Sequence, residues 1–351
     1  MGIPAHGGDI YDYKRPLLDF SANLNPLGMP EPVARAARAA VGDAAHYPDP
    51  ECRALREAIG AMDGVNPAWI LCGNGAADVI FRLVLARRPG KAMVLAPTFS
   101  EYEQALRAAG CPVKHWLLRA SRGFVLEEDI LEAIRPGLDM LFLCSTNNPT
   151  GLCADDTLLR RILARCGETG TRLVVDECFL PLTDGAGLGG ALGDNPHLFL
   201  LRAFTKSFAI PGLRLGYGLS SDGALLSACR DSGQAWSVSC VAQAAGIAAC
   251  GCAAWPERAR AFLRVERPRL QAGLRSLGLE VWPGEANYLL FRAENITDLK
   301  ALLVERGILI RSCANYRGLG PDFYRTAVRL PEENDRLLEA LGEVLPWQKQ
   351  L

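Results

Sequence analysis

One lysine, Lys206, has the sequence surroundings of a nucleophile. It follows the apolar run at residues 198–201 and lies in the segment Arg202-Ala203-Phe204-Thr205-Lys206-Ser207-Phe208, with apolar neighbours on both sides. Most lysines are surface charges, but a lysine that is removed from water loses its proton readily and then attacks aldehydes. The pattern therefore indicates an amine that can capture a carbonyl group.

Three further polar sites follow predicted strands, at residues 73–75, 147–151 and 176–177. Short apolar runs alternate with helical patterns from about residue 30 to residue 202, which predicts a mainly parallel sheet covered on both faces. Because ligands of such sheets bind beyond the carboxyl ends of the strands, we expect these polar sites to meet at one edge of the sheet.

Three of these residues could act on an aromatic heterocycle, and each also has an ordinary interpretation. Asp176 ends the run Leu173-Val174-Val175, where a carboxylate either caps a helix or holds a proton on a pyridine nitrogen. Asn148 is either a turn residue or an amide donor to a phenolic oxygen. Phe99 either stacks on a ring or belongs to the core.

Another group could bind a phosphate. Gly75 and Ala76 precede a predicted helix, whose first N–H groups and positive dipole end attract anions. Arg214 lies eight residues after Lys206, where its guanidinium would either grip a phosphate or form a salt bridge in a loop.

The order of five motifs along the chain resembles the fold-type-I pyridoxal-phosphate enzymes, the family of the aspartate and histidinol-phosphate aminotransferases. The resemblance covers essentially the whole chain. The motifs are Gly73-Asn74-Gly75, Asn147-Asn148-Pro149-Thr150-Gly151, Asp176-Glu177, Thr205-Lys206 and Gly212-Leu213-Arg214-Leu215-Gly216-Tyr217.

That resemblance implies an α/β fold, with a large domain built on a mainly parallel seven-stranded sheet and a smaller α+β C-terminal domain. The implied parts are an N-terminal segment at 1–35 that packs with the small domain, the large domain at 36–245 and the small domain at 246–351. It also implies a homodimer that shares site residues across its interface, with Tyr47 contributed by the partner subunit.

The resemblance further implies that pyridoxal 5'-phosphate forms a Schiff base with Lys206. By the same resemblance, Asp176 would pair with the ring nitrogen, Asn148 would donate to the ring oxygen, and Phe99 would stack on the ring face. The phosphate would be bound by Gly75, Ala76, Thr205 and Arg214.

Two positions depart from the pattern of the family. Phe179 stands where many relatives have a tyrosine that donates to the ring oxygen, and Ala203 stands where many have a serine or threonine for the phosphate. One hydrogen bond to the ring should therefore be missing, and the phosphate should be held less tightly or differently.

Four further stretches narrow the resemblance; they are residues 6–10, 19–28, 311–316 and Tyr324-Arg325 with Arg329. Together they resemble one branch of the family, the threonine-phosphate decarboxylases of cobalamin biosynthesis. This resemblance implies decarboxylation of L-threonine O-3-phosphate to (R)-1-aminopropan-2-yl phosphate, with the substrate bound by His6 (from the partner subunit), Asn23, Arg311 and Arg325. The alternatives are an aminotransferase for a phosphorylated substrate such as histidinol phosphate, and a noncatalytic protein.

Composition excludes several other classes of protein. The formal net charge of −1 provides no basic field for nucleic acid or an anionic membrane, and no signal peptide is recognisable at the start. Twelve scattered cysteines indicate reduced thiols in the cytoplasm, and four dispersed histidines predict no metal site.

The G-x-G-x-x-G match at 185–190 lacks a following helix, so we interpret it as a flexible loop.

Overall fold

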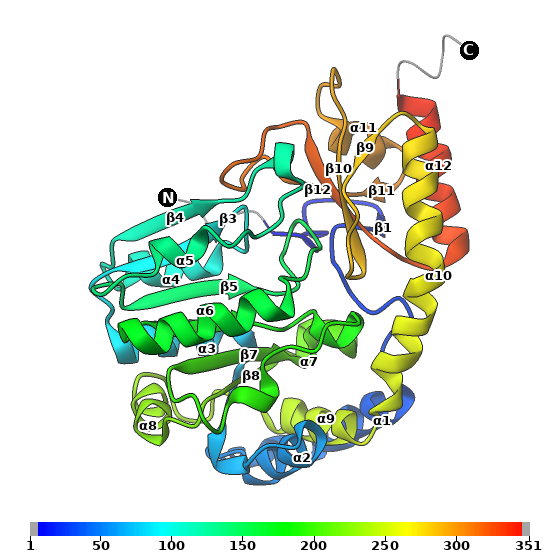
Figure 1. Cartoon of the computed structure of the whole chain (residues 1–351). Helices are drawn as coiled ribbons and strands as arrows, with labels where there is room; N and C mark the ends of the chain where they lie inside the picture. Colours follow the sequence, from blue (N-terminus) through cyan, green and yellow to red (C-terminus); the bar gives the residue numbers. More distant parts are fainter. Residues whose placement is uncertain (1–5, 346–351) are drawn as a thin grey trace.

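A seven-stranded sheet lies at the centre of the computed structural model, which describes residues 6–345 (Figure 1). Its strands are β2 (Ile70–Asn74), β3 (Ala92–Ala96), β4 (Val113–Leu117), β5 (Met140–Cys144), β6 (Arg172–Asp176), β7 (Leu198–Ala203) and β8 (Leu215–Leu219). Their order is β2-β8-β7-β6-β5-β3-β4, and only β8 runs antiparallel to its neighbours. The predicted mainly parallel sheet is confirmed.

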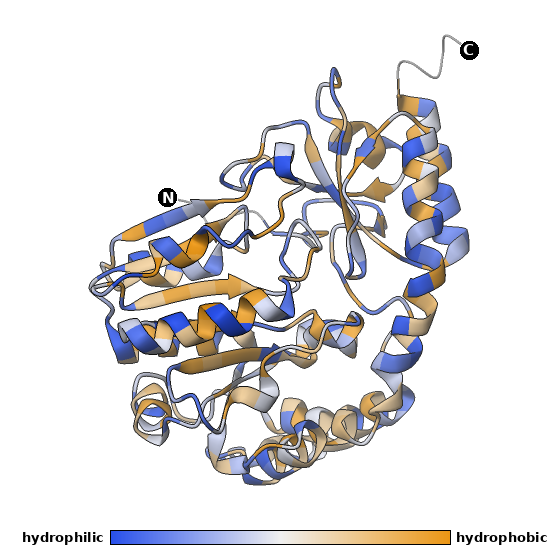
Figure 2. Ribbon diagram, viewed as in Figure 1, coloured by the Kyte–Doolittle hydropathy of each residue, from blue (hydrophilic) through white to orange (hydrophobic). Residues whose placement is uncertain are grey.

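Each face of this sheet carries its own hydrophobic core. Along β6, Val174 packs into one core and its neighbours Leu173 and Val175 pack into the other, because successive side chains of a strand point to opposite faces. Figure 2 shows apolar strands between helices of mixed character. Helices α3 (Gly75–Arg87), α4 (Glu101–Ala108) and α8 (Gly223–Asp231) contribute to one core, and α2 (Arg53–Asp63), α6 (Asp156–Thr169) and α9 (Cys240–Cys250) contribute to the other.

Helix α6 illustrates how the sequence sets these elements. Its first turn is capped by Asp155, whose Oδ1 accepts a hydrogen bond from Leu158 N at 2.9 Å. It ends at Gly170, where a φ of 71° suits a residue without a side chain. Its buried residues recur at helical spacing and face the sheet; they are Leu158, Leu159, Ile162, Leu163 and Cys166.

A smaller antiparallel sheet forms the C-terminal part of the chain. Its strands are β9 (Glu280–Val281), β10 (Tyr288–Arg292), β12 (Arg311–Ser312) and β13 (Phe323–Ala327), in the order β12-β13-β10-β9. It shares a separate hydrophobic core with α10 (Ala254–Ser276), α11 (Leu299–Glu305) and α12 (Pro331–Val344). In Figure 1, α10 runs along one side of the molecule from α9 to α12.

The N-terminal segment joins this smaller part. Strand β1 (Leu18–Asp19) pairs in parallel with β11 (Ile308–Leu309), and Phe20 is buried in the core of the smaller part. Three helices complete the fold, namely α1 (Glu31–Ala40), α5 (Ile130–Ala133) and α7 (Phe204–Ser207).

The expected domain boundaries at 35/36 and 245/246 fall inside α1 and α9, two helices that pack against each other. Because a boundary normally falls where few contacts cross, we propose that the large domain runs from α1 through α9 and that α10 leads into the small domain.

None of the twelve cysteines, all within the described part of the chain, forms a disulfide. Between residues 6 and 345, no helix combines the length and the apolar character needed to span a membrane.

Candidate active site

Lys206 lies at the carboxyl end of β7, in the short helix α7, and is partly buried. Desolvation, with the nearby positive charges of Arg325 and Arg214, lowers the pKa of its amine to about 8, while Cys178 and Asp176 oppose this shift. Within residues 6–345, no hydrogen bond or ion pair engages its Nζ atom. The amine is therefore available as a nucleophile near neutral pH.

The Asp176 carboxylate is held through both of its oxygens at the end of β6. Its Oδ2 accepts a hydrogen bond from the Tyr102 hydroxyl at 2.6 Å, and its Oδ1 accepts one from Cys178 N at 2.9 Å. The helix-cap interpretation of Asp176 is wrong, because the next helical turn begins only at Leu180. The sequence did not single out Tyr102, which lies on the buried side of α4.

The orientation of the Asn148 amide is fixed by two donors. Its Oδ1 accepts hydrogen bonds from Arg325 Nη1 and from the Tyr316 hydroxyl, the latter at 3.2 Å. Because both contacts occupy the amide oxygen, the NH₂ group is the end that remains able to donate to a ligand.

Gly75, Ala76 and Arg214 lie together at the start of α3. Gly75 has a φ of +82°, and a Cβ at this position would lie 2.6 Å from Arg214 Nη2. A Cβ at Gly216 would lie 2.4 Å from Ala76 N. The two glycines therefore let a guanidinium and a helix N-terminus approach closely, which makes a cradle for an anion. Thr205, also predicted to bind phosphate, is buried next to Lys206 in the chain.

Two arginines face each other across adjacent strands of the smaller sheet. Arg311 of β12 is the direct register partner of Arg325 of β13, and they are 8% and 4% exposed. The Arg311 Nη2 donates to Asn315 Oδ1 at 2.7 Å, and its guanidinium lies 5.5 Å from the centre of the Tyr316 ring.

Arg325 is surrounded by neutral oxygens. Besides Asn148, its Nη2 donates to Ser21 O at 2.7 Å. The Asn23 amide, oriented with its oxygen towards Arg325, accepts from Nε at 3.2 Å and from Nη1 at 3.3 Å. No carboxylate in the described part of the chain pairs with this guanidinium, so its positive charge can meet an anionic substrate.

His6 lies beside Phe99 of its own chain. Its Nε2 is 3.0 Å from Glu101 Oε1, and the two ring centres are 5.9 Å apart. The N-terminal segment is held there by Gly8, whose N–H donates to Ser21 Oγ at 2.7 Å. The assignment of His6 to the site of a partner subunit remains a prediction.

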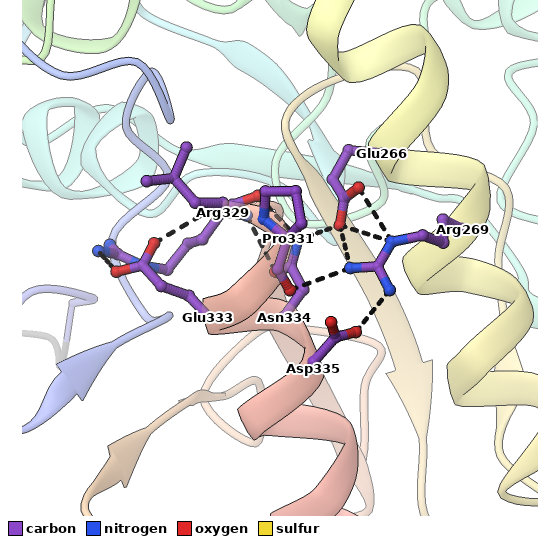
Figure 3. A network of polar contacts seen from close by, with 8 residues as sticks. Glu266, Arg269, Arg329, Pro331, Glu333, Asn334 and Asp335 are labelled. Carbon is purple, nitrogen blue, oxygen red and sulfur yellow. Dashed lines mark hydrogen bonds and ion pairs between the residues drawn. The ribbon is translucent and has the colours of Figure 1, made fainter.

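Two residues lie apart from this group. Tyr47 is 79% exposed and stacks on Trp236, with ring centres 4.5 Å apart; its assignment to a partner's site remains a prediction. Arg329 donates to Glu333 Oε1 at 2.7 Å and to Asp19 O at 3.0 Å. Figure 3 shows Arg329 and Glu333 in a polar network between α10 and α12, so Arg329 has a structural role.

The glycine-rich segment 185–190 packs against a buried carboxylate. Glu177 Oε1 accepts a hydrogen bond from Leu188 N at 2.7 Å, and Glu177 Oε2 pairs with Arg202 Nη2 at 2.7 Å. A Cβ at Gly187 would lie 2.6 Å from the same Glu177 Oε1. A single 3₁₀ turn, Gly189–Ala191, overlaps the end of this segment, and strand β7 comes next in the chain, so the expected absence of a following helix is confirmed.

A part-buried lysine, a carboxylate fixed through both oxygens and an anion cradle at the carboxyl edge of a parallel sheet fit pyridoxal phosphate. The family of class I and II aminotransferases matches residues 15–341, and the chain belongs to this family. Pyridoxal 5'-phosphate is its cofactor, as the sequence predicted.

Individual relatives narrow the comparison. The chain is 44% identical over 351 residues to the threonine-phosphate decarboxylase of Salmonella typhimurium, covering 97% of this chain and 96% of that protein. The solved histidinol-phosphate aminotransferase of Clostridium acetobutylicum has a TM-score of 0.88 at 27% identity, covering 95% of this chain and 100% of that one. The solved L-threonine-O-3-phosphate decarboxylase of Porphyromonas gingivalis has a TM-score of 0.83 at 25% identity, covering 92% and 98%.

Proposed function

We propose that this chain decarboxylates L-threonine O-3-phosphate to (R)-1-aminopropan-2-yl phosphate and carbon dioxide, with pyridoxal phosphate bound to Lys206. The product supplies the aminopropanol linker in cobalamin biosynthesis. The observation that carries the proposal is the direct pairing of Arg311 with Arg325 across β12 and β13, both buried.

The pair of arginines matches a substrate with two anionic groups. Arg325 contacts only neutral oxygens in the described part of the chain, so its positive charge is not balanced there by a carboxylate and can attract the carboxylate of the substrate. Arg311 lies next to it and is assigned to the phosphate of the substrate, together with His6. A simple amino acid would not need this second buried cation.

The remaining residues bind and orient. When bound, pyridoxal phosphate supplies a ring that accepts the electron pair released as a bond at the α-carbon breaks. Asp176 would keep a proton on the ring nitrogen, and the Asn148 NH₂ would donate to the ring oxygen. Phe99 would cover the ring face. Lys206, with a pKa of about 8, has enough neutral amine near neutral pH to serve as the nucleophile that would hold the cofactor.

The phosphate cradle fixes the other end of the ring. Backbone N–H groups of Gly75 and Ala76, the Thr205 hydroxyl and the Arg214 guanidinium are assigned to the cofactor phosphate. Ala203 contributes no hydroxyl there, so the grip rests on these four residues.

Orientation of the substrate decides which bond breaks, because cleavage needs the bond to stand perpendicular to the ring. We assign this orientation to the phosphate clamp of Arg311 and His6, which would hold the carboxylate out of the ring plane. An aminotransferase would place the α-hydrogen there instead.

The second candidate is an aminotransferase for a phosphorylated substrate, favoured by the TM-score of 0.88 to a histidinol-phosphate aminotransferase. Purified holoenzyme should be given threonine phosphate without any 2-oxoacid, and released carbon dioxide measured. Release with multiple turnovers supports the decarboxylase. No release, together with amino transfer from histidinol phosphate to 2-oxoglutarate, would establish the alternative.

We also propose that the protein works as a cytoplasmic homodimer in which Tyr47 serves the site of the partner subunit. Tyr47 and Trp236 form an exposed aromatic stack, which a subunit interface would cover. Mixing inactive Tyr47→Ala and Lys206→Ala proteins should restore part of the activity, since mixed dimers hold one intact site. Mixtures that exchange subunits but stay inactive would contradict the sharing of sites.

A further inference from the structure

Tyr102 joins the proton-holding carboxylate of the site to its ring-stacking residue. It lies in the first turn of α4 and is completely buried. Its hydroxyl donates to Asp176 Oδ2 at 2.6 Å, a short bond of the kind made to an ionised acceptor. With Cys178 N on Oδ1 at 2.9 Å, both oxygens of Asp176 are engaged and the plane of the carboxylate is set.

The same ring supports Phe99. Phe99 meets Tyr102 edge-on, with ring centres 5.6 Å apart at 80°, and Tyr102 stacks on Phe142 at 5.2 Å and 18°. The hydroxyl and the ring of Tyr102 therefore act on two different elements of the site.

We propose that Tyr102 is a positioning residue for the pyridine nitrogen of the cofactor, acting through Asp176. Its hydroxyl holds the carboxylate in one orientation, because it donates to Oδ2 while Cys178 N donates to Oδ1. An oriented carboxylate is what would keep the ring nitrogen protonated. Burial raises the pKa of Tyr102 well above its ordinary value, so the hydroxyl keeps its proton and remains a donor.

The test compares two conservative variants. Tyr102→Phe removes the hydroxyl and keeps the ring. Tyr217→Phe is the matched control, because Tyr217 is also buried and its hydroxyl donates to another carboxylate, Asp63 Oδ2, at 2.8 Å. Each apoprotein is loaded with pyridoxal phosphate carrying ¹⁵N in the ring, and the nitrogen resonance is recorded at neutral pH without substrate.

We expect the ring-nitrogen resonance of Tyr102→Phe to move towards the unprotonated position, while Tyr217→Phe keeps the wild-type position. In turnover, kcat of Tyr102→Phe should fall about tenfold to a hundredfold, the loss of one hydrogen bond to a charged group, with KM little changed. A wild-type resonance in folded, loaded Tyr102→Phe would overturn the proposal, even if its thermal stability had fallen.

If Tyr102→Phe does not fold, 3-fluorotyrosine at position 102 keeps the shape of the side chain and makes the hydroxyl more acidic. The ring-nitrogen resonance should then differ from that of the unsubstituted protein, and an identical resonance would count against the proposal. The inference rests on the cofactor assignment within the proposed function. It is independent of the reaction catalysed, because the resonance is observed before any substrate is added.

Discussion

Lys206 Nζ lies 5.6 Å from the centre of the Phe179 ring, the residue at which the resemblance to the family implied a missing hydroxyl. Phe179 packs edge-on against Tyr288, with ring centres 4.9 Å apart. The amine therefore faces an apolar ring that offers no hydroxyl. Asn148 is left as the donor assigned to the ring oxygen.

Restoring the hydroxyl with Phe179→Tyr should stabilise the ionised ring oxygen. The pH at which the absorbance of the bound cofactor changes should then fall by about one unit, the effect of one added hydrogen bond. Absorbance titration of the holoenzyme measures this midpoint. Phe179→Leu, which adds no donor, serves as the control, and an equal fall in both variants would contradict this explanation.

The lowered pKa of Lys206 predicts how the apoprotein depends on pH. Capture of pyridoxal phosphate should accelerate as pH rises towards about 8 and level off above it, since the neutral amine reacts. Stopped-flow absorbance gives the rate. A rate that kept rising in proportion up to the ordinary lysine pKa of 10.5 would show that the amine is not perturbed.

The same pKa predicts a change in stability. The folded pKa of about 8 lies below the ordinary 10.5, so the unfolded chain binds more protons between these values and the stability of the apoprotein rises with pH across that window. At neutral pH, Lys206→Met should raise the free energy of unfolding by about 1–2 kcal/mol, allowing for the partial exposure of the amine. Denaturant unfolding of both apoproteins tests this, and the difference should shrink above pH 8. A constant difference at all pH values would speak against it.

Gly75→Ala should weaken cofactor binding, because its Cβ would lie 2.6 Å from Arg214 Nη2. We expect the Kd for pyridoxal phosphate to rise about tenfold or more. Gly64→Ala is the matched control: Gly64 also has a positive φ, 67°, but nothing lies within 4 Å of its Cβ position. The control should lose about 1–2 kcal/mol of stability from backbone strain and retain wild-type affinity. Equal affinity loss in both variants would remove Gly75 from the cradle.

Arg311→Ala should lower kcat/KM for threonine phosphate about a hundredfold, the cost of losing a charged contact to the substrate phosphate. Arg311→Lys should recover only part of this loss, because the ammonium group of lysine keeps the positive charge but lacks the paired N–H donors of a guanidinium. Arg317→Ala is the control, since Arg317 lies nearby in the chain but pairs with Glu103 at 3.2 Å on the surface. Undiminished decarboxylation by Arg311→Ala would refute the clamp.

Strand β8 marks a limit of prediction from sequence. Strands β3 and β5 of the parallel sheet were recognisable because both of their faces are buried and their residues are continuously apolar. Strand β8 was not predicted, since Gly216 and Gly218 interrupt its pattern. Both glycines are required by close packing, as a Cβ at Gly218 would lie 2.3 Å from Phe199 Cζ and one at Gly216 would lie 2.4 Å from Ala76 N.

Some residues of the candidate site were likewise recognisable from the sequence, and others were not. Lys206, Asp176 and Asn148 lie in short motifs whose order along the chain was informative. Tyr102 lies on the buried side of an amphipathic helix, and nothing in its local pattern reveals that its hydroxyl meets Asp176. Similarly, the contact of His6 with Glu101 depends on a fold-back of the N-terminal segment, which local sequence does not encode.

Reduction of the holoenzyme with borohydride, followed by mass analysis of its tryptic peptides, tests most directly where the cofactor is bound. We expect a single pyridoxal-phosphate adduct, on the peptide that contains Lys206. An adduct on any other lysine, or none on a protein that retains the cofactor's absorbance, would contradict it.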